Sequence, residues 1–150
     1  MSTLQNFLVT DIPSATAEAE AALMRLPEDK RDWSAGGDAR SALDMLAEMA
    51  IVNGSAADML ETRSGMANFD LAELERHKAA LRADWPALKS LLDTNTARVV
   101  EAIRNLSDED LKSELQMPWG PMPLEQIAAY PYWNAKYHEG QINFIASMLG

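Results

Sequence analysis

The chain has 150 residues, 47% of them hydrophobic, and a formal net charge of −10, which is enough length for one domain over residues 1–150 with a single substantial core. Its 13 basic residues are scattered, and this argues against a nucleic-acid partner, whose phosphates require clustered Lys and Arg. The chain contains no cysteine, no basic N-terminal leader and no run of the roughly 20 apolar residues that a membrane span needs, so we expect a cytoplasmic protein without disulfides, thiolate chemistry or a membrane partner.

Apolar residues recur at helical spacing along the first part of the chain, which is rich in alanine and leucine. The first predicted helix covers about Leu4 to Leu26, and Pro13 either kinks it or marks its true start, because proline lacks the interior N–H. A loop closed by Gly36-Gly37 follows. Asp38 is then predicted to cap a second helix that continues to about Leu60.

The middle of the chain predicts a short helix and a third long one. Thr62 to Phe69 is interpreted as a connection, and Asp70 as the cap of a short helix that ends at Arg82. Pro86 is predicted to be the first residue of the third long helix, which continues through Leu106.

The last part of the chain predicts a fourth long helix after two short connecting segments. Ser107 begins a brief helical turn, and Met117 to Pro123 is interpreted as a rigid loop. The fourth helix covers about Leu124 to Leu149, with a local kink expected at Pro131. Four long helices with modest connections indicate an all-α bundle.

Polar side chains interrupt the apolar pattern of the second and fourth long helices. Asn134 and His138 are four residues apart and therefore lie on one helix face. Glu48 has apolar neighbours, and Asp44 precedes it by one turn on the same face. If the two helices pack together, Glu48 points at Asn134 and His138.

Three kinds of chemistry are compatible with such a group. An imidazole, a carboxylate and an amide oxygen are all ligands for a divalent metal, and helical bundles build metal sites from facing helices. A carboxylate beside an imidazole is also the minimal general acid/base pair and needs no metal. Alternatively, Glu48 accepts a hydrogen bond from His138 and Asn134 bridges them, which gives a satisfied polar network.

Several segments together resemble the DinB/YfiT-like superfamily. They are Pro27 to Trp33, Ser41 seven residues before Glu48, Tyr137 to Ile142, and the terminal Leu149-Gly150. The most specific part is the His-x-Gly-Gln-Ile signature that begins at His138. The resemblance covers essentially the whole chain, and it implies a DinB/YfiT-like four-helix bundle with short additional helices in the connections, usually assembled as a homodimer.

The resemblance also implies a site. Many members hold a divalent metal with three histidines, one on the second long helix and a His-x-x-x-His pair on the fourth, and some are thiol-dependent transferases or isomerases. Carried over to this chain, His138 occupies the last histidine, whereas Asn134 and Glu48 stand where the other two are expected. One imidazole, one carboxylate and one amide form a harder and weaker ligand set than three imidazoles.

Two functions stay open on the sequence alone. The first is a divalent-metal-dependent enzyme related to thiol S-transferases, in which Glu48, Asn134 and His138 hold zinc, nickel or manganese weakly and the ion activates a water or a thiol. The second is a metal-free small-molecule-binding or scaffold protein on the same fold. The sequence names neither a substrate nor a catalytic residue.

Overall fold

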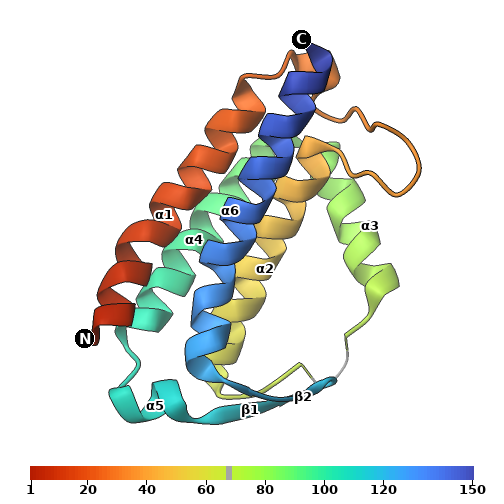
Figure 1. Cartoon of the computed structure of the whole chain (residues 1–150). Helices are drawn as coiled ribbons and strands as arrows, with labels where there is room; N and C mark the ends of the chain where they lie inside the picture. The colour runs from red at the N-terminus through yellow and green to blue at the C-terminus, as the bar shows by residue number, and fades with distance from the viewer. Residues whose placement is uncertain (67–68) are drawn as a thin grey trace.

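Four long helices lie side by side in the computed structural model, which describes residues 1–66 and 69–150 (Figure 1). α2 packs against α4 and α6, and α1 packs against α6 and α4. The predicted all-α four-helix bundle is therefore confirmed. Its members are α1 (Thr3–Met24), α2 (Ala42–Thr62), α4 (Trp85–Arg104) and α6 (Leu124–Leu149).

Shorter elements connect these helices. A 3-10 turn, η1 (Glu28–Lys30), follows α1, and α3 (Leu71–Arg82) stands beside α2 (Figure 1). A short helix, α5 (Asp108–Lys112), leads into an antiparallel hairpin of β1 (Glu114–Met117) and β2 (Gly120–Pro123). Of the connection predicted over residues 62–69, residues 67–68 lie outside the part of the chain described.

The hairpin corrects the prediction of a loop from Met117 to Pro123. Glu114 pairs with Pro123, and Met117 pairs with Gly120. Gly120 has a φ of 124°, a left-handed value that glycine adopts at little cost, so the chain can reverse there. Buried and exposed residues alternate along β1 as in a half-buried strand.

The prediction that Asp38 caps the second helix is wrong. The cap is Ser41, whose hydroxyl accepts a hydrogen bond from the Asp44 N–H at 3.1 Å. Ser41 also donates to Asp32 at 2.6 Å, which holds the cap against the preceding loop. By contrast, Asp70 caps α3 as predicted, by accepting from two backbone N–H groups of the first turn.

Both internal prolines lie inside continuous helices, Pro13 in α1 and Pro131 in α6. Neither marks a helix start. α2 and α4 approach closely at Gly54, where an added Cβ would lie only 2.6 Å from the Asn95 amide nitrogen. On another face, α2 packs along α6. Within the described residues, no helix has both the length and the apolar character that crossing a membrane requires.

Candidate functional site

Glu48 on α2 meets Asn134 and His138 on α6. His138 Nε2 lies 3.1 Å from Glu48 Oε1, and Asn134 Nδ2 donates to the same oxygen at 3.2 Å. Asn134 and His138 are buried, whereas 18% of the Glu48 side chain is exposed. The structure thus brings together the three side chains that the sequence singled out, with only the carboxylate reaching solvent.

The second oxygen of Glu48 is held by Arg40, a residue that the sequence analysis did not single out. Arg40 NH1 lies 2.6 Å from Glu48 Oε2, and Arg40 Nε donates to Asp44 at 2.6 Å. Arg40 precedes Ser41, the N-cap of α2, so helix spacing alone does not reveal this contact. The guanidinium is therefore a fourth member of the site.

Asp44 anchors that guanidinium to the rest of the protein. It is buried, and besides Arg40 it contacts Lys78 at 3.2 Å and Arg82 at 2.8 Å, both from α3. Burial opposes ionisation of Asp44, but hydrogen bonds from Arg40 and Arg82 and the charges of the basic side chains lower its pKa. One carboxylate thereby connects α3 to the side chain that holds Glu48.

Glu48 is ionised at neutral pH. Its burial favours the neutral acid, yet the hydrogen bond from His138 and the charge of Arg40 outweigh that and lower its pKa from 4.5 to about 2. An ionised carboxylate can only accept hydrogen bonds. His138 Nε2 must therefore carry a proton to bond with Glu48.

The other ring nitrogen of His138 lies 2.7 Å from Gln141 Oε1. A doubly protonated ring satisfies both contacts as they stand. A neutral ring with its proton on Nε2 satisfies Nδ1 once the Gln141 amide turns to present its nitrogen, an exchange that leaves the shape of the side chain unchanged. In both arrangements Nε2 donates to Glu48.

The stability of the protein should depend on the ionisation of Glu48 in acid. The pKa is lower in the folded chain than its ordinary 4.5, so this contribution is complete above the ordinary pKa and is lost as the pH falls towards about 2. We expect the free energy of unfolding to fall between about pH 5 and pH 2 more steeply for the wild-type protein than for Glu48→Gln. Urea denaturation at several pH values checks this, with Glu28→Gln, an exposed carboxylate of η1, as the control. Equal slopes for wild type and Glu48→Gln would contradict it.

The donor set does not fit a divalent ion. The imidazole, the amide and the guanidinium all present N–H groups to Glu48, whereas an ion would need lone pairs there. Asn134 Oδ1 is buried without a hydrogen-bond partner, but turning it towards Glu48 would oppose two acceptors. Across residues 1–66 and 69–150, no three histidine, aspartate or glutamate side chains come together as an ion site.

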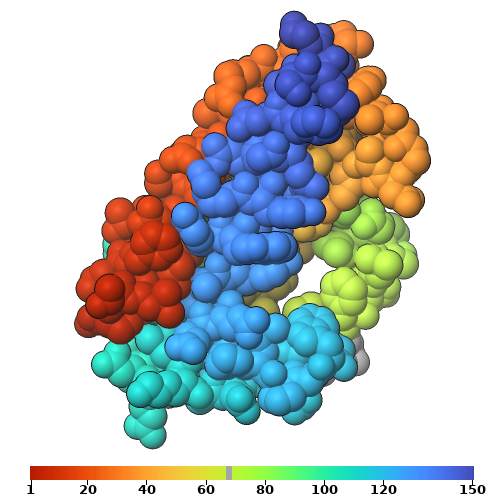
Figure 2. All heavy atoms as spheres, viewed as in Figure 1, coloured from red at the N-terminus to blue at the C-terminus, as the bar shows by residue number. Residues whose placement is uncertain are grey.

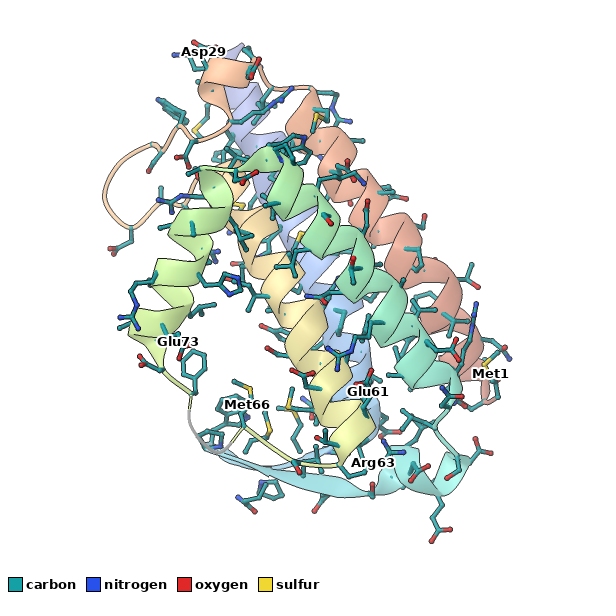
Figure 3. The ribbon with its side chains drawn as sticks, turned by 180° about the vertical axis from the view of Figure 1, so that it is seen from behind. Met1, Asp29, Glu61, Arg63, Met66 and Glu73 are labelled. Atoms are coloured by element: carbon teal, nitrogen blue, oxygen red, sulfur yellow. The ribbon has the colours of Figure 1, made fainter. Side chains whose placement is uncertain are left out.

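Two open regions lie beside α6. One is an opening between α6 and α3, with the hairpin along its lower edge (Figure 2). Seen from behind, Met66 lies in the segment that follows α2, and Glu73 lies in the first turn of α3 (Figure 3). The pKa of the Tyr130 hydroxyl is raised, mainly because the side chain is partly buried and also because of the negative charge of Glu48. Nearer the C-terminal end of α6, a groove of about 460 Å³ is lined mainly by apolar side chains together with Arg40 and Gln141. Each of these two polar residues contacts a member of the site.

Solved structures with the same fold are known, although no curated protein matches the sequence. YfiT from Bacillus subtilis, described as a probable metal-dependent hydrolase, superposes with a TM-score of 0.81 at 15% identity, over 100% of this chain and 90% of its own. A mycothiol-dependent maleylpyruvate isomerase gives 0.72 at 14% identity, and the match covers 95% of this chain and 63% of the isomerase. The colibactin self-resistance protein ClbS, in complex with double-stranded DNA, gives 0.67 at 15% identity over 95% of both chains.

A sequence family matches the chain over residues 14–142, a span that includes Glu48, Asn134 and His138. That family is the DinB superfamily, and it agrees with the fold of the structural relatives. This chain belongs to the DinB superfamily.

Proposed function

We propose that this chain is a metal-independent small-molecule-binding member of the DinB superfamily. The supporting observation is that both oxygens of Glu48 accept from N–H donors: His138 and Asn134 at one oxygen and Arg40 at the other. The guanidinium supplies the positive charge that a metal ion would otherwise bring to this carboxylate. Charge-assisted hydrogen bonds of this kind are strong and directional, so Glu48 is an anion held in a fixed position with part of its side chain exposed.

The resemblance to the family supports two further parts of the proposal. The protein acts on or binds a small molecule, and it is a homodimer. ClbS is described with double-stranded DNA, whereas our expectation that this chain binds no nucleic acid rests on its net charge of −10 and stays a prediction.

A divalent-metal-dependent enzyme related to thiol S-transferases is the second candidate. The descriptions of YfiT as a probable metal-dependent hydrolase and of the isomerase as mycothiol-dependent favour it. The buried, unpartnered Asn134 Oδ1 also favours it, because such an atom could turn towards a cation. Zinc, nickel or manganese would then be held by Glu48, Asn134 and His138, but only after Glu48 leaves Arg40.

Metal titration of Arg40 variants separates the two candidates. Arg40→Met removes the guanidinium and keeps an apolar side chain of similar length, which frees Glu48 Oε2. Calorimetric titration with zinc, nickel and manganese should show no His138-dependent site in the wild-type protein. Weak binding should appear in Arg40→Met and disappear again in Arg40→Met/His138→Ala.

Two controls make that experiment decisive. His77→Ala removes the exposed histidine of α3 and accounts for ions bound at the surface. Ligand-observed NMR with neutral and anionic aromatic fragments tests the binding function itself, with fragments expected to lose contact in His138→Phe. One ion per wild-type chain that is lost in His138→Ala, or thiol transfer that depends on added metal, would refute the proposal in favour of the enzyme.

A further inference from the structure

α3 has one largely apolar face, and the bundle covers only half of it. Steps of three and four residues along this face join Leu71, Leu74, Lys78 and Leu81. Lys78 and Leu81 are buried, and Lys78 contacts Asp44 of α2 at 3.2 Å. Leu74 is only half-buried, and Leu71 is 60% exposed. The apolar face of α3 is therefore uncovered towards its N-terminal end.

α2 presents a second face that is only partly covered. The row that begins with Asp44 and Glu48 continues at helical spacing through four half-buried residues: Ile51, Val52, Ser55 and Met59. Asp44 contacts α3 and Glu48 contacts α6, so this row faces the space between those two helices. Figure 2 shows that space as an opening. Two incompletely covered apolar faces, one on α2 and one on α3, thus border the same opening.

The contact at Asp44 sets which residues of the two helices lie at the same level. Moving from that contact along α3 towards its N-terminus, the helix reaches Leu74 after one turn and Leu71 after two. Moving along α2 towards its C-terminus, the helix reaches Glu48 after one turn and Val52 after two. α2 and α3 run antiparallel (Figure 1), so Leu71 lies at the level of Val52.

The carboxylate of Glu48 gives this space a negative end. An ionised carboxylate has about four acceptor positions, and His138, Asn134 and Arg40 occupy three of them. With 18% of its side chain exposed, Glu48 can accept one more hydrogen bond. Tyr130 precedes Asn134 by one helical turn, and at its hydroxyl the charge of Glu48 outweighs that of Arg40, which adds to burial in raising the pKa of Tyr130.

We propose that the opening between α3 and α6 binds an elongated apolar molecule that carries one basic amine. The apolar body lies along Val52 of α2, with Leu71 of α3 on one side and Tyr130 of α6 on the other, and the amine donates to Glu48. From Glu48 to Met59 the row on α2 extends about 16 Å, which is long enough for a decyl chain. Such a ligand removes the uncovered apolar surface of both helices from water.

The class of the ligand follows from charge complementarity. The chain has a net charge of −10, and Glu48 is ionised and partly exposed, so a cationic head group is attracted and a carboxylate is repelled. For its small-molecule role the inference rests on the proposed function, which it deepens by naming the place and the chemical class of the ligand.

Three probes with the same decyl chain test the charge requirement: decylamine, decanol and decanoate, each below its critical micelle concentration at neutral pH. Calorimetric titration of the wild-type protein should show one decylamine per chain. Decanol should bind more weakly, and decanoate about tenfold or more weakly than decylamine. Glu48→Gln should abolish the preference for the amine and keep the binding of decanol.

Two lysine variants test the place. Val52→Lys and Leu71→Lys put a cation on either side of the opening and should each weaken decylamine binding about tenfold or more. Both positions are partly exposed, so the variants should fold, which thermal denaturation checks. Phe144→Lys is the matched control, because Phe144 is an exposed apolar residue of the groove near the C-terminal end of α6. It should bind decylamine like the wild-type protein.

Three outcomes would overturn the inference: a wild-type protein that binds no decylamine, decanoate that binds as tightly as decylamine, or binding that is lost in Phe144→Lys and kept in Val52→Lys and Leu71→Lys. Failure of the proposed function is distinguishable. A metal ion bound by wild-type His138 refutes metal independence whatever the decylamine titration shows. Aromatic fragments that bind in a His138-dependent manner, without any decylamine binding, overturn only the inference about the opening.

Discussion

The double variant Glu48→His/Asn134→His is expected to bind one zinc or nickel ion per chain, unlike the wild-type protein. Together with His138 it offers three imidazoles at positions that already converge, and it removes the carboxylate that Arg40 holds. An ion present at a thousand times its dissociation constant raises the free energy of unfolding by about 4 kcal/mol. Thermal denaturation with and without zinc, followed by reversal with a chelator, measures this gain.

The zinc-dependent stabilisation should require histidine at all three positions, 48, 134 and 138. Adding His138→Ala to the double variant should abolish the zinc-dependent stabilisation, and each single histidine variant should show a smaller effect. Zinc-dependent stabilisation that survives His138→Ala, or that is absent from a folded double variant, would show that these positions do not form one site.

Asp44→Ala is expected to lower the free energy of unfolding by about 3–5 kcal/mol, the usual cost of removing one partner of a buried ionic group. The variant leaves Lys78 buried without its aspartate and releases Arg82 and Arg40. The loss should therefore affect both the attachment of α3 and the position of Glu48. Urea denaturation of the wild-type and variant proteins measures it.

A second aspartate on α2 provides the matched control. Asp58 pairs with Arg98 at the surface, and exposed pairs contribute only about 0–1 kcal/mol, so Asp58→Ala should change stability little. Removing the buried cation as well, in Asp44→Ala/Lys78→Met, should recover part of the loss. Equal losses for Asp44→Ala and Asp58→Ala would contradict the role assigned to Asp44.

The helices were predictable from sequence because their signals are local. Apolar spacing located the four long helices, and Asp70 capped α3 as predicted, since a cap depends on residues within one turn. Asp38 failed as a cap because Ser41 has two partners there, and one of them, Asp32, lies outside the helix. The hairpin at Met117 was missed because strand pairing depends on a partner strand that local composition does not reveal.

The sequence predicted where the site lies, but it did not identify all of the residues that form it. Glu48 and His138 were expected to meet if their helices packed together, and they do. Arg40 was missed because it precedes the helix in sequence, and only the folded loop turns its guanidinium back onto Glu48. That one contact changes the interpretation, because it replaces a set of metal ligands with a carboxylate held by cations and N–H donors.

The ring nitrogens of His138 report most directly on whether Glu48 is held by N–H donors or shares a metal ion. Long-range nitrogen–proton NMR correlation spectra of the wild-type protein at neutral pH, recorded with and without excess zinc, identify which ring nitrogen carries a proton, and His77→Ala assigns the second histidine. We expect His138 Nε2 to be protonated and its signal to be unchanged by zinc. An unprotonated Nε2 whose signal shifts with one equivalent of zinc would contradict a metal-independent site.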